Sequence, residues 1–106
     1  MVKEISKIEQ IEVMKGFKGR FFHTNSTTIA FWKIEKGAIL PEHNHIHEQT
    51  TQLIEGTLEM TIGKKKSILK PGMIVCIPSN VKHSGKALTP CILTDTFCPV
   101  RDDYKF

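Results

Sequence analysis

Short runs of strand-forming or apolar residues, separated by glycine, proline and polar turns, constrain the fold of this chain more than any other feature. Residues 57–62 show this best, because Leu58, Met60 and Ile62 alternate with polar side chains, as on a strand with one buried face. Three further runs of this kind are 27–36, 73–77 and 91–97. Since no segment reads convincingly as a long helix, the sequence predicts an all-β protein, a barrel or sandwich of antiparallel strands.

Composition and charge narrow the classes of protein to which the chain can belong. Its 106 residues predict one domain, 1–106, in which residues 1–15 form an N-terminal arm with no clear period. No apolar run is long enough to cross a membrane, and the charged N-terminal stretch lacks the apolar segment of a secretory signal. The net charge of +4 comes partly from residues 64–66, which we interpret as a solvated lysine turn rather than a nucleic-acid surface.

Cysteine usage is typical of a cytoplasmic protein. The three cysteines, Cys76, Cys91 and Cys98, are odd in number and contain no CxxC pair. Cys76 and Cys91 stand in apolar runs, so we predict that both are reduced packing residues. A thiol nucleophile is the alternative interpretation.

A cluster of histidines between two glycines is the part of the sequence that most clearly indicates a functional site. His43 and His45 are two residues apart, so on an extended strand both imidazoles would project from one face, and Gln49 keeps that parity. His83 follows a predicted bend far downstream, and an antiparallel barrel is the kind of fold that would bring it to the others. Imidazoles that converge from separate strands predict a site for one divalent transition metal, for which Ni, Zn, Fe, Mn and Co are all suitable.

Two motifs in this order resemble those of the cupin superfamily. The first, G-x5-H-x-H-x3-E-x6-G, matches residues 37–56 at every spacing, with Gln49 in place of the glutamate. The second, G-x5-P-x-G-x2-H-x3-N, matches residues 72–87, with Asn80 in place of a glycine and Ala87 in place of the last asparagine. Asparagine is the next-best residue for a left-handed turn. The resemblance implies a double-stranded β-helix (cupin jelly-roll barrel) with a metal in its mouth, and it suggests a homodimer.

The C-terminal tail, residues 95–106, sharpens this resemblance. Its pattern D-x-F-x-P-x-R-x-D-aromatic, together with the histidine cluster, is similar to that of the pectin-degradation cupins of the KdgF type. Those proteins open the ring of 4,5-unsaturated uronates, so the resemblance implies a small anionic sugar as partner. By position, it assigns the metal ligands and the pocket residues as follows: His43, His45, Gln49 and His83 to the metal, and Asp95, Phe97 and Arg101 to the substrate.

The residues themselves leave several roles open. Asp95 shares the parity of Leu93, so it points inward either to orient a ligand or to move a proton. Arg101 either clamps a substrate carboxylate or pairs with a neighbouring aspartate. Phe97 belongs either to the core or to a face on which a sugar stacks, and His47 is expected at the rim of the pocket or on the surface.

Three functions are consistent with this site. A neutral Gln49 leaves the charge of the cation less neutralised than a glutamate would, which favours polarisation of a substrate over dioxygen chemistry. We therefore favour a ring-opening lyase or isomerase. The alternatives are a cupin dioxygenase that uses a redox metal and a non-enzymatic module that binds a metal or a sugar.

Overall fold

The computed structural model describes residues 1–106 and is built almost entirely from short antiparallel strands. Its elements, in chain order, are η1 Ile5–Lys7, β1 Ile11–Met14, β2 Phe17–His23, β3 Thr28–Ile34, β4 Ile39–His43, β5 Glu48–Glu55, β6 Leu58–Ile62, β7 Lys65–Leu69, β8 Ile74–Ile77, β9 His83–Ala87, β10 Cys91–Cys98 and η2 Asp102–Tyr104. Both η elements are single turns of 3-10 helix, and no helix is long and apolar enough to cross a membrane. The all-β prediction is confirmed.

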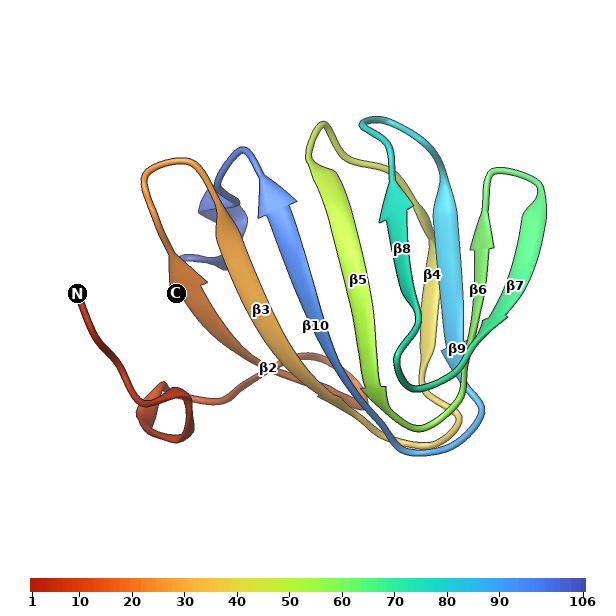
Figure 1. Ribbon diagram of the computed structural model, residues 1–106, viewed down its shortest axis with the longest axis horizontal. Helices are drawn as coiled ribbons and strands as arrows, with labels where there is room; N and C mark the ends of the chain where they lie inside the picture. The colour runs from red at the N-terminus through yellow and green to blue at the C-terminus, as the bar shows by residue number, and fades with distance from the viewer.

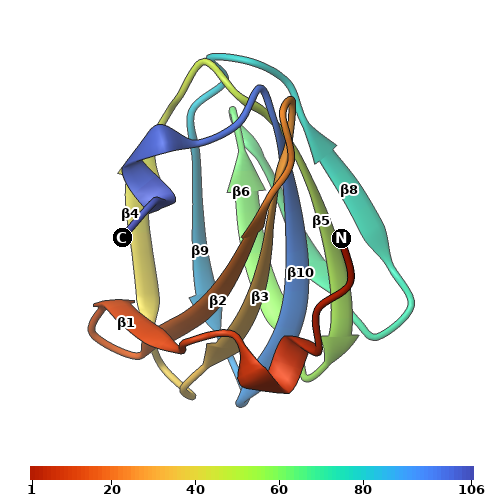
Figure 2. The ribbon, with the colours of Figure 1, turned by 90° about the vertical axis from the view of Figure 1, so that its left-hand side faces the viewer.

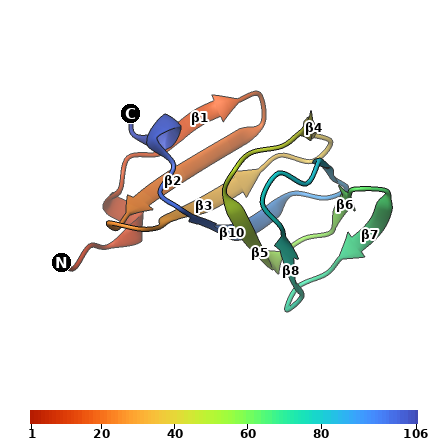
Figure 3. The ribbon, with the colours of Figure 1, turned by 90° about the horizontal axis from the view of Figure 1, so that it is seen from above.

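The strands form two sheets that face each other as a jelly-roll sandwich (Figure 1). The larger sheet has the order β1-β2-β3-β10-β5-β8, and the smaller sheet has the order β4-β9-β6-β7. Figure 3 shows the two layers from above, with β5 and β8 on one side and β6, β7 and β9 on the other. Because no ladder joins the sheets, edge strands remain at β1, β8, β4 and β7, so the sheets do not close as an antiparallel barrel would.

Buried side chains, which alternate with more exposed ones along the strands, fill the space between the sheets. On β10, Cys91, Leu93, Asp95 and Phe97 are buried, which confirms that Asp95 points inward with Leu93. On β3, Trp32 is buried and packs edge-to-face against Phe17 of β2. The core is therefore continuous along the sandwich, and one carboxyl group is placed inside it by the strand period alone.

Several local predictions need correction. Residues 11–14 of the expected N-terminal arm form strand β1, which pairs with β2 from Phe17 onward. Lys65 and Lys66 lie on β7 rather than in the turn, since alternate positions of an edge strand face solvent. Cys76 is exposed on the outer side of β8, so the predicted packing role holds for Cys91 alone.

Strand β1 and the C-terminal tail lie on the same side of β2, whereas the N-terminus lies on the opposite side of the larger sheet (Figures 2 and 3). Figures 2 and 3 show β1 and the C-terminal turn η2 near each other beside β2. The tail is fixed there because the Arg101 amide donates to the Thr28 hydroxyl (2.8 Å), and the His23 ring contacts both Thr28 Oγ1 and the Tyr104 carbonyl. Residues 101–104 are thereby held against the interior of the sandwich.

Candidate metal centre and pocket

Three imidazoles converge at one end of the sandwich. His43 closes β4 and lies directly opposite His83, the first residue of β9, in the antiparallel ladder. Their ring centroids are 4.2 Å apart, and the His45 ring lies 4.9 Å from that of His83. One ring nitrogen of each imidazole falls within 4.8 Å of the others. Two nitrogens bound to one ion at about 2.0–2.1 Å lie no more than about 4.2 Å apart, so the three rings need only a small inward shift to share one ion.

The route that brings His45 to this site differs from the predicted one. β4 ends at His43, so His45 lies in the loop before β5 and not on a strand. Alternation along one strand therefore explains neither why His43 and His45 point to the same site nor why Gln49, the second residue of β5, points there as well. The loop is held by the Asn80 amide, which donates to the His45 carbonyl (2.8 Å), and Asn80 itself has the left-handed φ of 63° expected from the second motif.

Hydrogen bonds fix the tautomer of every imidazole in this group. Nδ1 of His43 lies 2.8 Å from the Pro41 carbonyl, and Nδ1 of His83 lies 2.9 Å from that of Val81. Nδ1 of His45 lies 2.9 Å from the His47 carbonyl. A carbonyl oxygen only accepts, so each Nδ1 carries the proton and each Nε2 of a neutral ring offers a lone pair to the centre. Histidines that ligate metals are oriented in this way.

Two features of the centre are favourable if a cation is bound there and unfavourable without one. His83 Nε2 is buried with no hydrogen-bond partner. Nε2 of His45 lies 3.1 Å from Oε1 of Gln49, and in this tautomer both atoms bear lone pairs. Burial lowers the pKa values of His45 and His83, and Arg101 lowers that of His45 further, which favours the neutral form of both rings. Three nitrogens and one amide oxygen that face the same point are a suitable donor set for a divalent transition metal.

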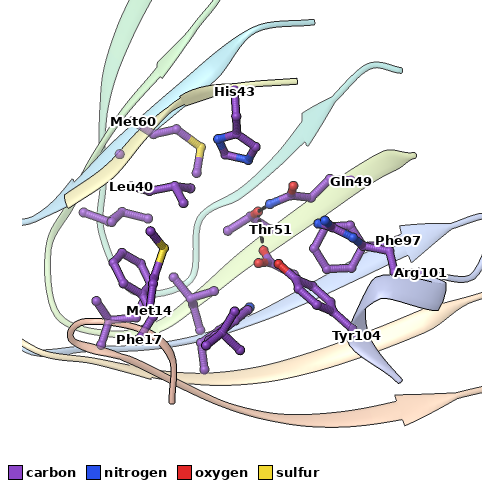
Figure 4. Close-up of a pocket in the computed structure, with 17 residues that line it drawn as sticks. Met14, Phe17, Leu40, His43, Gln49, Thr51, Met60, Phe97, Arg101 and Tyr104 are labelled. Carbon is purple, nitrogen blue, oxygen red and sulfur yellow. Dashed lines mark hydrogen bonds between the residues drawn. The ribbon is translucent and has the colours of Figure 1, made fainter. Parts of the chain in front are cut away.

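A line of hydrogen bonds leads from this centre into the core. Gln49 Nε2 donates to Thr51 Oγ1 (3.0 Å), and Thr51 Oγ1 donates to Asp95 Oδ1 (2.5 Å), as Figure 4 shows in part. Thr51 and Asp95 lie directly opposite each other on β5 and β10. The pairing of β5 with β10 therefore links the Asp95 carboxyl, through Thr51, to the Gln49 amide that faces the histidines.

The Asp95 carboxyl has an unusual proton affinity. Its burial raises its pKa from the usual 3.8 to about 6, although hydrogen bonds from Thr51, Gln49 and Trp32 and the charge of Arg101 oppose the rise. A pKa in this range suits a group that both takes and releases a proton near neutrality. Geometry alone is also consistent with the orienting role, because the carboxylate accepts the proton of Thr51.

The tail supplies the rim of the pocket. The Arg101 guanidinium stacks 4.8 Å from the Phe97 ring centroid and 4.0 Å from that of Tyr104. Its Nε and Nη2 donate to the Asp103 carboxylate at 3.1 and 2.6 Å, which holds the pKa of Asp103 below its usual value. The ion pair that the sequence left open is thus formed with Asp103 and not with Asp102. Nη1 of Arg101 remains without a protein partner.

These groups surround a cavity of about 70 Å³ with two chemically distinct ends (Figure 4). The polar end contains His43, Gln49, Thr51, Asp95 and Arg101. The apolar end is formed by large side chains from both sheets and from β1, namely Met14, Phe17, Leu40, Leu58 and Met60. A ligand in this cavity would meet His43 from the smaller sheet and Gln49 and Asp95 from the larger sheet, with Arg101 of the tail beside them.

The structure adds two residues that sequence reasoning did not assign to the site. Thr51 bridges Gln49 and Asp95, and its signal was available, since it lies two positions after Gln49 on the same strand face. Tyr104 lines the cavity and stacks on Arg101. His47 is half-buried beside His45 and Phe97, but its ring is not part of the three-histidine group.

Comparison with known proteins agrees with this architecture. The model of the cupin domain family Cupin_2 matches residues 30–97. The chain is 38% identical over 71 residues to the pectin degradation protein KdgF of Dickeya dadantii strain 3937. That match covers 65% of this chain and spans 64% of the length of the relative.

Solved structures extend the similarity over most of the chain. KdgF from Halomonas sp. is 28% identical with a TM-score of 0.87, and the match covers 92% of each chain. An RmlC-like cupin from Shewanella frigidimarina NCIMB 400 is 25% identical with a TM-score of 0.92, covering 96% of this chain and 93% of that one.

Proposed function

Because this chain belongs to the cupin domain family, we propose that it is a metal-dependent enzyme of pectin degradation that opens the ring of 4,5-unsaturated uronates. The observation that carries the proposal is the donor set itself: three Nε2 lone pairs and one amide oxygen beside a buried carboxyl and an arginine. The similarity to two KdgF proteins supports the substrate class. In this proposal His43, His45, Gln49 and His83 hold one divalent cation, whose bound form would supply Lewis-acid polarisation of a substrate oxygen.

The proposed reaction is an isomerisation, so the protein has to move a proton without net gain or loss. The hemiacetal hydroxyl loses its proton, the bond between C1 and the ring oxygen breaks, and an aldehyde forms at C1. C4 then gains a proton as the ring oxygen becomes a ketone. In this scheme Asp95 takes the first proton and returns one to C4, for which its pKa of about 6 is well placed.

Arg101 would bind the carboxylate of the substrate. Arg101 lines the same cavity as Asp95, its Nη1 makes no bond to Asp103, and stacking between Phe97 and Tyr104 restricts the guanidinium plane. A preorganised guanidinium orients a planar anion at a small entropic cost. Phe97 is buried beside His45 and beneath Arg101, and in this proposal it would form part of the apolar wall of the sugar pocket.

The proposal is tested with 4,5-unsaturated galacturonate and protein loaded with Zn, Ni, Co, Mn or Fe. Turnover removes the conjugated double bond, so ultraviolet absorbance should fall faster than in the spontaneous reaction. Metal-stripped protein and the Asp95→Asn variant are the two controls. Asp95→Asn should lose activity while its metal content, measured by mass spectrometry, stays normal, because an asparagine oxygen still accepts from Thr51.

Two outcomes would contradict the proposal. If ultraviolet absorbance falls no faster than in the spontaneous reaction with any of the metals, the proposed reaction is wrong. Loss of metal from Asp95→Asn would make Asp95 a structural support of the centre and not a proton carrier.

The proposal also includes a cytoplasmic homodimer as the working form. Its support is the absence of any disulfide among the three cysteines and the exposure of Ile54, Ile74 and Ile92 on the outer face of the larger sheet. Light scattering at several protein concentrations measures the mass in solution. A monomer at every concentration would remove this part without affecting the reaction.

A further inference from the structure

An amide at a metal centre poses a problem of orientation that a carboxylate does not. The oxygen of Gln49 has lone pairs for a cation, whereas its nitrogen carries two hydrogens and donates no lone pair. The two ends have nearly the same size, so packing alone does not select between them. A glutamine ligand therefore needs a hydrogen-bond partner that distinguishes nitrogen from oxygen.

Thr51 has the chemistry to make this distinction. A threonine hydroxyl carries one proton, and Thr51 Oγ1 directs it to Asp95 Oδ1 at 2.5 Å. Toward Gln49, 3.0 Å away, the same oxygen presents only lone pairs, so it accepts from the amide nitrogen. The amide oxygen is consequently turned toward Nε2 of His45, at 3.1 Å.

The surroundings make this arrangement rigid. Thr51 is completely buried at 0% exposure, and Gln49 and Asp95 are 5% and 7% exposed. The β-branched side chain of threonine has a restricted χ1 angle, and Thr51 lies directly opposite Asp95 on the neighbouring strand. Water has little access to replace the hydroxyl, so reversing the amide would leave a buried donor or acceptor unpaired.

We propose that Thr51 is a positioning residue: its hydroxyl, held by Asp95, fixes the Gln49 amide with its oxygen toward the three-histidine centre. Thr51 itself touches neither the metal nor the substrate in this account. The inference rests on the metal site of the proposed function but not on the sugar reaction, and its test measures metal binding alone.

The experiment is a set of four variants titrated with Co²⁺ and Zn²⁺ against a competing chelator. Thr51→Val has nearly the same shape without the hydroxyl, and it should bind metal about 10–100-fold more weakly, as for loss of other partners of a ligand. Thr51→Ser keeps the hydroxyl and should restore affinity close to that of the original protein. The visible absorption of bound Co²⁺ should change in Thr51→Val, because an amide turned nitrogen-first leaves the coordination sphere.

The matched control uses a ligand that needs no orientation. Gln49→Glu offers an oxygen at both ends, so adding Thr51→Val to it should change affinity by no more than about twofold. An equal loss in both backgrounds would overturn the inference, since Thr51 would then act through the fold in general. Unchanged affinity in Thr51→Val alone would overturn it as well.

Each failure can be traced to its source. If the original protein binds neither metal, the metal site of the proposed function fails, and this inference falls with it. If the original protein binds metal but shows no turnover, only the reaction fails, and the inference stands or falls on the variants. Circular dichroism and thermal melts check folding, and Thr51→Ala replaces Thr51→Val with the same expectation if the latter does not fold.

Discussion

The two ends of the cavity are built by opposite means. At the apolar end, Met14, Phe17 and Leu40 come from β1, β2 and β4 and line the cavity with apolar side chains that make no directional bonds. At the polar end, Gln49, Thr51 and Asp95 are joined by specific hydrogen bonds in a space that water hardly reaches. The first end is stabilised by burial of apolar area, and the second consists of groups whose burial costs free energy.

This difference indicates which end the chain maintains for stability and which for function. Buried polar groups persist when they are paired or when a ligand completes them. His83 Nε2 has no partner in the protein, and the His45–Gln49 contact brings two acceptors together. A cation would satisfy both of these acceptors at the polar end, whereas the apolar end contains no polar group that needs a partner.

The largest expected effect comes from removing a side chain at the apolar end, which tests whether the two ends are independent. Phe17→Ala should lower the free energy of unfolding by about 3–5 kcal/mol, because it deletes a buried ring that packs against Trp32. Metal affinity should change by no more than about twofold. Urea unfolding and a metal titration measure the two quantities, and a large change in affinity would show that the ends are not independent.

The next effect concerns the carboxyl at the polar end of the metal-free protein. The folded-state pKa of Asp95 is raised, so its contribution to stability is present below its usual 3.8 and is lost as pH rises through about 6. Asp95→Asn has no such loss and should gain about 2–3 kcal/mol relative to the original protein between pH 4 and pH 8.

The comparison of these two proteins cancels the opposing titrations of His45 and His83, whose pKa values are lowered. Urea unfolding at a series of pH values measures the difference. A constant difference across this range would mean that the carboxyl titrates in the folded state as it does in water.

A third effect tests whether a cation completes the polar end. Metal at about 100 times its dissociation constant should stabilise the fold by about 2.7 kcal/mol. His83→Ala should abolish this gain while its metal-free form stays folded, because Nε2 has no protein partner and the ring gives up only the Nδ1 contact with the Val81 carbonyl. Thermal melts with and without metal give the result, and equal stabilisation of both proteins would place the ion elsewhere.

The smallest effect lies at the exposed rim. Asp103 is partly exposed, so Asp103→Asn should cost less than about 1 kcal/mol of stability despite its two bonds to Arg101. Releasing Nε and Nη2 should leave metal affinity unchanged. A loss much greater than this would mean that the tail, and not the sheets, holds the polar end in place.

The sequence predicts well what depends on a repeating period. The parity of Leu93, Asp95 and Phe97 placed a carboxyl inside the sandwich, and the bend before His83 placed an imidazole at the start of a strand. Both outcomes follow from alternation and turn chemistry, which are local properties.

Features that depend on cross-strand register or on the paths of loops could not be predicted from the sequence. Nothing in the spacing states that Thr51 lies opposite Asp95 or that His43 lies opposite His83. His45 reaches the centre through a loop whose course is set by a contact with Asn80, 35 residues away in sequence (80 − 45). The choice of Asp103 over Asp102 by Arg101 depends on the single turn of η2.

The most direct test of the central claim is an anomalous diffraction measurement on crystals grown with Zn²⁺ or Co²⁺. One strong peak is expected among the three histidines, about 2.0–2.2 Å from Nε2 of His43, His45 and His83 and from Oε1 of Gln49. A peak that contacts Nδ1 atoms, or the absence of any peak at this end of the cavity, would contradict the account.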